Sequence, residues 1–133
     1  MALPDRALQV LDLMTQRGFG DRPLLFICHS LGGLVAKQIL RASAESEDQI
    51  TKKIFDATRG VLFLATPHTG SDLASRLDAF RAIFGTTVAM EDLRAHDPHL
   101  RELLNWYRNN PNKAIIRTVT YYETRPVYGF RIV

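Results

Sequence analysis

The sequence predicts an α/β domain in which a parallel sheet of about three strands is flanked by helices. Two apolar segments of strand length, residues 24–28 and 60–65, alternate with segments whose apolar residues recur at helical spacing. A third segment, residues 114–122, is rich in the β-branched and aromatic residues that favour strands. Strands that alternate with helices are typical of parallel pairing through right-handed crossovers.

Length and composition limit the classes of function. The chain has 133 residues and a net charge of +3, with its basic residues scattered, so no nucleic-acid partner is predicted. One cysteine excludes an internal disulfide and a cysteine-based zinc site, and is compatible with a reducing compartment. No apolar stretch reaches the length of about 18 residues that a membrane span needs.

The first half of the chain predicts a helix, a strand and a second helix. Apolar residues from Leu3 to Met14 follow helical spacing, and the glycines at residues 18–20 end this helix. Residues 24–28 are apolar throughout, which predicts a central strand covered on both faces. The next helix runs from Leu31 to about Ser43. Residues 44–53 are polar and are interpreted as a loop or a helix end.

The second half predicts a strand, two helices and a last strand. Strand 60–65 ends in the tight loop 66–72, at the edge of the sheet where open parallel sheets bind ligands. A helix over residues 73–84 is followed by an ambiguous segment. Asp97 and Pro98 then form a helix start. The tail from residue 123 onward is interpreted as a loop.

Ser30 is the centre of the functional prediction. Residues 23–37 read as strand, sharp turn and helix, which is the layout of a nucleophile elbow. Such a turn forces the serine into an unfavourable backbone conformation, so its neighbours must be small. Gly32 and Gly33 meet this need on the helix side, and Cys28 takes the place where glycine is usual. The alternative is a strand, turn and helix with an incidental serine.

Three segments resemble the α/β-hydrolase superfamily, and within it the serine esterases that include the serine-active-site-containing proteins and relatives of GPI inositol-deacylases. They are residues 23–37, residues 60–72 (Gly-Val-Leu-Phe-Leu-Ala-Thr-Pro-His-Thr-Gly-Ser-Asp) and residues 121–124 (Tyr-Tyr-Glu-Thr). The resemblance implies a partial α/β-hydrolase fold and a Ser–acid–His triad. It also implies a lipase-like or esterase-like activity on acyl or lipid esters, with no cofactor.

The resemblance assigns roles position by position. Ser30 matches the nucleophile, and the backbone N–H of Leu31 matches one oxyanion donor. Glu123, just past the third strand, is the candidate acid. His68 matches a histidine that is usually structural in such families, and it becomes the default general base if this segment performs the chemistry alone. His29 is adjacent to Ser30 and points away from it on a tight turn, so we expect a structural role.

The departures from the family pattern concern the histidine and the second oxyanion donor. The triad order in this fold is Ser, acid, His, yet no histidine follows Glu123. Nothing before Leu24 resembles the His-Gly loop of the family. We therefore expect residues 1–133 to form one truncated hydrolase core, weak or inactive alone, whose partners are an ester substrate and other segments of a larger polypeptide. The alternative is a non-catalytic interaction or regulatory module of a larger protein.

Two further predictions come from spacing and strand count. The histidines and carboxylates show no metal-ligand spacing, and the glycines show no phosphate-loop spacing, so no metal is expected. A sheet of three strands would leave apolar strand surface exposed, which predicts self-association.

Overall fold

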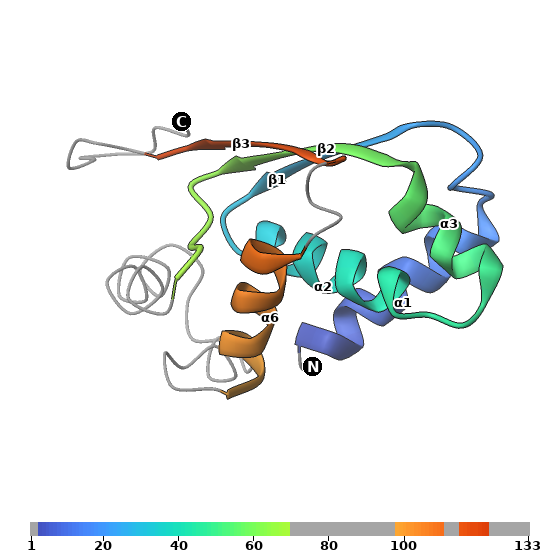
Figure 1. Cartoon of the computed structure of the whole chain (residues 1–133), viewed down its shortest axis with the longest axis horizontal. Helices are drawn as coiled ribbons and strands as arrows, with labels where there is room; N and C mark the ends of the chain where they lie inside the picture. The colour runs from blue at the N-terminus through green and yellow to red at the C-terminus, as the bar shows by residue number, and fades with distance from the viewer. Residues whose placement is uncertain (1–2, 70–97, 111–114, 123–133) are drawn as a thin grey trace.

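The computed structural model describes residues 3–69, 98–110 and 115–122. Its elements, in chain order, are α1 (Leu3–Gln16), β1 (Leu24–His29), α2 (Gly32–Ala44), α3 (Gln49–Ala57), β2 (Thr58–Leu64), α6 (Pro98–Asn109) and β3 (Arg117–Tyr121) (Figure 1). The helix predicted for residues 73–84, the helix-start residue Asp97 and the tail from residue 123 lie outside the described residues.

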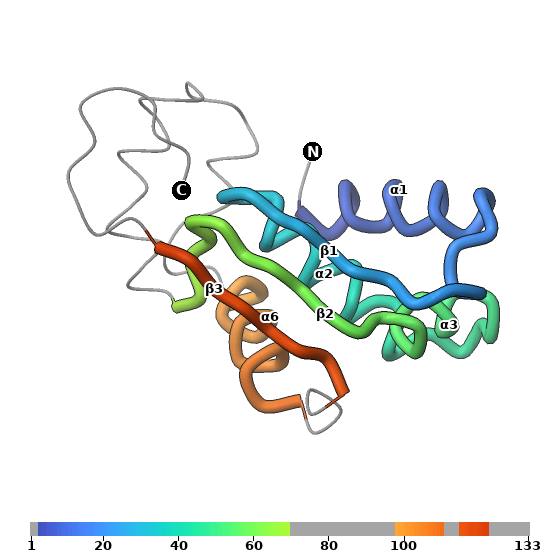
Figure 2. Tube along the Cα trace, turned by 90° about the horizontal axis from the view of Figure 1, so that it is seen from above, coloured from blue at the N-terminus to red at the C-terminus, as the bar shows by residue number. Residues whose placement is uncertain are grey.

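The described strands form one parallel sheet in the order β1-β2-β3 (Figure 2). Cys28 on β1 pairs with Phe63 on β2, and Phe63 pairs with Thr120 on β3. The predicted parallel sheet of three strands, flanked by helices, is confirmed. The carboxyl ends of all the strands lie at one edge of the sheet, as parallel pairing requires.

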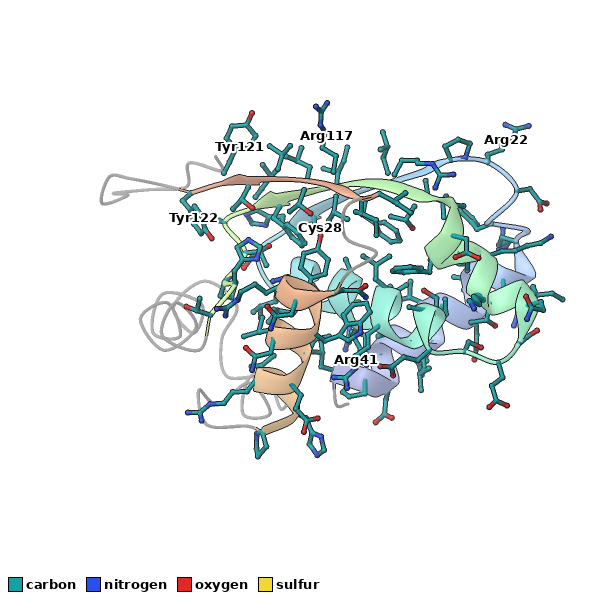
Figure 3. All side chains as sticks on the ribbon, viewed as in Figure 1. Arg22, Cys28, Arg41, Arg117, Tyr121 and Tyr122 are labelled. Atoms are coloured by element: carbon teal, nitrogen blue, oxygen red, sulfur yellow. The ribbon has the colours of Figure 1, made fainter. Side chains whose placement is uncertain are left out.

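The described helices all lie on one side of the sheet (Figure 1). On β1 the residues that face the helices are buried or half-buried, whereas Leu25 and Ile27 are 73% and 74% exposed on the outer side. The outer side also carries Arg117 and Tyr121, which point away from the helices (Figure 3). The interpretation of β1 as a central strand covered on both faces is therefore wrong. The expected exposure of apolar strand surface is confirmed.

The core lies between the sheet and the helices. α2 is its central helix, because α2 contacts α1, α3, α6 and β1. One cluster lies directly beneath the sheet and consists of Cys28, Ala36, Leu40, Phe55, Val61, Phe63, Tyr107 and Ile116. Two smaller clusters join α2 to α6 and join α2 to α1 and α3. Burying such clusters is the main favourable term in folding.

Helix α3 corrects the prediction of a polar loop or helix end over residues 44–53. The side chain of Asp48 caps this helix: it accepts hydrogen bonds from the Ile50 N–H (3.2 Å) and the Thr51 hydroxyl (3.0 Å). Ile54 and Phe55 lie on the buried, apolar face of this helix. Among the described helices, none is long and apolar enough to span a membrane.

Candidate functional site at the Ser30 turn

Ser30 lies between β1 and α2, so the predicted strand, sharp turn and helix are present. Its backbone φ is 55°, a left-handed conformation that costs a non-glycine residue about 1–2 kcal/mol. Three hydrogen bonds hold this backbone in place. The Ser30 N–H donates to the Leu64 carbonyl (2.8 Å), and the Ser30 carbonyl accepts from the Thr66 hydroxyl (2.7 Å) and the Gly33 N–H (3.1 Å).

The turn also depends on close packing between α2 and the end of β2. A Cβ at Gly33 would overlap the Thr66 side chain and would lie 2.8 Å from the Phe63 ring. A Cβ at Gly32 would meet open space. The close approach of helix to strand is therefore made at Gly33, and it holds Thr66 against the Ser30 carbonyl.

The side chain of Ser30 is buried, and no described group pairs with its hydroxyl. The residue is only 4% exposed, and its Oγ has no hydrogen-bond partner among the described residues. A buried hydroxyl without a partner costs about 1–3 kcal/mol, so its presence calls for an explanation. Because the Oγ is closed from solvent, a substrate can reach it only if neighbouring groups move.

Leu31 places a backbone donor beside Ser30. Leu31 is the N-cap residue of α2, with φ −64° and ψ −21°, and its side chain makes no capping hydrogen bond. Within the described ranges, the N–H of Leu31 enters no backbone hydrogen bond. A donor at a helix N-terminus, where the helix dipole favours negative charge, is suited to an oxygen that becomes negative.

His68 lies in the loop after β2 and contacts other groups than the Ser30 hydroxyl. Its Nδ1 is 2.6 Å from the Nζ of Lys37, and its Nε2 is 3.4 Å from the Thr120 hydroxyl. Its ring packs edge-on against Phe63, with 4.8 Å between ring centroids. The structure thus brings His68 to Lys37, and no hydrogen bond joins it to the Oγ of Ser30.

Lys37 is a residue of this site that the sequence did not indicate, and Thr66 was expected only as part of the loop 66–72. Lys37 falls four residues after Gly33, on the buried side of α2, and is only 1% exposed. A lysine on a buried helical stripe was the signal that could have drawn attention to it, because lysine is rarely buried without a partner. The role of Thr66 depends on a contact with Ser30 that spacing does not reveal.

The other predicted site residues are not close partners of the Ser30 hydroxyl. His29 is exposed at the end of β1. Cys28 is buried beneath the sheet, and burial raises its pKa to about 11, so the thiol stays protonated and inert at neutral pH. Burial likewise raises the pKa of Tyr107, whose hydroxyl is hydrogen-bonded to Thr118. Glu123 lies outside the described residues. In the part of the chain that is described, no cluster of metal-ligating side chains is found.

Comparisons with known proteins place the chain beside a family of esterases. Residues 6–96 match the family described as "Putative serine esterase (DUF676)". The chain is 28% identical to Protein SERAC1 of Danio rerio over 127 residues, which cover 96% of this chain and 19% of that protein. It is also 28% identical to the SERAC1 proteins of Bos taurus and Homo sapiens, over 92% of this chain and 18% of each. No solved structure matches the chain.

Proposed function

The chain belongs to the serine esterase family DUF676, and we propose that Ser30 is a nucleophile that attacks the carbonyl carbon of an acyl ester. The observation that carries this proposal is that the hydroxyl of Ser30, on a left-handed turn, has no partner among the residues that the structure describes. The hydroxyl makes no hydrogen bond to a described group that would offset its burial, so a chemical role for this oxygen atom would explain its position. This is the geometry expected of a nucleophile elbow in an α/β-hydrolase core.

The proposed chemistry is acyl transfer to water in two steps. The Oγ of Ser30 bonds to the ester carbonyl carbon, its proton goes to a base, and the alcohol leaves. The N–H of Leu31 stabilises the oxygen that becomes negative. Water then releases the acid and regenerates Ser30. Glu123 stays the candidate acid of the triad, and the substrate class is a lipid or other acyl ester.

We expect the activity of these residues alone to be weak. No described group accepts the proton of Ser30, and its Oγ is closed from solvent. Loss of a general base removes about two to four orders of magnitude in rate. The chain also spans about a fifth of the length of the curated relatives it matches. The activity of any longer protein that contains it is therefore a separate proposal.

A second candidate is a non-catalytic module in which the hydrolase-like core serves as a docking or regulatory domain. The observation that favours it is the closed hydroxyl of Ser30. In that case Ser30 would be an inherited turn residue without a chemical role.

Hydrolysis of p-nitrophenyl esters tests the proposal. We expect slow hydrolysis above background that is lost in Ser30→Ala. Ser43→Ala is the matched control, because Ser43 is another buried serine of the chain and its hydroxyl is hydrogen-bonded to the Leu40 carbonyl. Equal rates in the wild type and Ser30→Ala would exclude Ser30 as the nucleophile. If the wild type hydrolyses the ester rapidly and Ser30→Ala does not, a general base must be present, and His68 would be the first candidate to test.

A further inference from the structure

Lys37 is held in a setting that an ordinary surface lysine does not have. It is 1% exposed, and its Nζ lies 5.1 Å from the ring centroids of both Phe63 and Tyr107. Aromatic faces attract a cation at such distances. The same Nζ lies 2.6 Å from the Nδ1 of His68. The lysine therefore joins the helix that follows Ser30 to the loop that follows β2.

The chemistry of this contact specifies which nitrogen of His68 carries the proton. With Lys37 as an ammonium, which has three donors and no acceptor, the Nδ1 of His68 is the acceptor in this contact. A neutral imidazole whose Nδ1 accepts carries its proton on Nε2. This places the Nε2–H on the side of the Thr120 hydroxyl, 3.4 Å away on β3. Neither ring nitrogen is then directed to Ser30 by a hydrogen bond.

The same loop fixes the backbone of Ser30. Thr66, two residues before His68, donates its hydroxyl hydrogen bond to the Ser30 carbonyl. Lys37 holds the far end of this loop, and Gly33 packs against its near end. Two contacts thus connect α2 to the loop, one at each end of the segment from Thr66 to His68.

From this arrangement we propose that Lys37 is a positioning residue: it holds His68 as the Nε2–H tautomer and thereby keeps Thr66 and the Ser30 turn in place. His68 then serves as an anchor and does not accept the proton of Ser30. The role of Lys37 in the reaction depends on the proposed function of Ser30. The tautomer of His68 does not, and it can be measured separately.

Nitrogen-15 NMR of the imidazole reports the tautomer directly. We expect the wild type to show Nδ1 as an unprotonated acceptor and Nε2 as an N–H at neutral pH. In Lys37→Met, whose side chain is unbranched and one atom shorter but has no donor, we expect His68 to populate both tautomers. A proton on Nδ1 of His68 in the wild type would overturn the proposal, because the lysine would then not be donating.

Two substitutions of His68 test whether an acceptor at the position of Nδ1 is needed for the reactivity of Ser30. The amide oxygen of asparagine lies as many bonds from Cβ as Nδ1 does, whereas that of glutamine lies one bond farther, as Nε2 does. With a fluorophosphonate probe, we expect His68→Asn to label Ser30 within about threefold of the wild-type rate. We expect His68→Gln and Lys37→Met to be slower by about tenfold or more, because the turn loses its anchor.

The outcomes separate the two proposals. Equal labelling rates in His68→Asn and His68→Gln, or an unchanged rate in Lys37→Met, would overturn the positioning role. Near-complete loss of labelling in both His68 variants would identify His68 as the base instead. If the wild type is not labelled at all, the proposed function of Ser30 fails, and the NMR result alone decides whether Lys37 holds the tautomer.

Discussion

Strands β1 and β2 both leave the sheet through a residue with a left-handed backbone, Ser30 with φ 55° and Ala65 with φ 54°. The two residues lie side by side in the register, because His29 pairs with Leu64 just before them. Each donates its N–H to the neighbouring strand, Ser30 to the Leu64 carbonyl and Ala65 to the Tyr121 carbonyl, both at 2.8 Å.

The two turns differ in what the side chain carries. Ala65 has only a methyl group as its side chain, so its left-handed backbone presents no reactive side-chain atom. Ser30 has a hydroxyl that is buried without a partner among the described groups. Backbone strain is therefore not by itself a sign of function in this molecule. The unpaired hydroxyl distinguishes the Ser30 turn, and the comparison can be tested by changing one turn at a time.

The largest expected effect is that of Gly33→Ala, a substitution in α2 that disturbs the packing of Thr66 beside the Ser30 turn. The added methyl group would overlap Thr66 and approach Phe63 to 2.8 Å. We expect the free energy of unfolding to fall by about 3 kcal/mol or more, as overpacking of a rigid contact does. Urea denaturation measures it. Gly32→Ala is the control, because its methyl group would meet open space, and a loss as large there would contradict the account.

The next effect is the loss of protein stability at alkaline pH that the buried thiol of Cys28 should cause. Cys28 pairs with Phe63 in the sheet, close to both turns. Burial raises the pKa of this thiol from 9.0 to about 11. Between these values the unfolded thiol ionises while the folded thiol stays protonated. The free energy of unfolding should thus fall by at most about 2 kcal/mol as pH rises through this range, because partial solvation screens the thiolate, and should not change on this account below it. Unfolding titrations of wild type and Cys28→Ala measure the difference, and parallel curves would contradict the assignment.

Glycine at either turn should relieve the left-handed strain. We expect Ser30→Gly and Ala65→Gly each to raise the free energy of unfolding by about 1 kcal/mol, because glycine adopts positive φ without a steric penalty. Ser30→Ala should also stabilise by about 1 kcal/mol, because it removes an unpaired buried hydroxyl. Thermal and urea unfolding measure both effects. A clear loss of stability in Ser30→Ala would mean that the hydroxyl has a structural partner.

The smallest expected effect lies on the outer face of the strand that leads to Ser30. Ile27 is 74% exposed there, so Ile27→Thr should change the free energy of unfolding by only about 0.5 kcal/mol. Light scattering at high concentration should show less self-association, because an exposed apolar strand residue is removed. Val61→Thr is the control on the buried side, 2% exposed, and it should cost clearly more stability.

The local parts of the site could be predicted from the sequence because they are contiguous. Residues 23–37 carry the strand, the turn and the helix in one stretch, so the apolar pattern and the glycines sufficed to place Ser30 between β1 and α2. The burial of β1 could not be predicted in the same way. A strand that is apolar throughout looks the same whether one or both of its faces are covered, and the structure leaves Leu25 and Ile27 exposed.

The contacts that surround Ser30 could not be predicted because they join distant parts of the chain. Lys37 meets His68 across 31 positions, and Thr66 meets Ser30 across 36. Helix α3 was missed for a different reason. Its first turn is mostly polar and begins at a capping residue, Asp48. Its buried residues come late in the helix, at Ile54, Phe55 and Ala57.

The central claim is that the unpaired hydroxyl of Ser30 is a nucleophile, and covalent labelling with a fluorophosphonate probe tests it most directly. Intact-mass analysis and peptide mapping should show one adduct, on Ser30, in the folded protein, with none in Ser30→Ala or after unfolding in urea. A folded wild-type protein that stays unlabelled, or an adduct on another serine that persists in Ser30→Ala, would contradict the account.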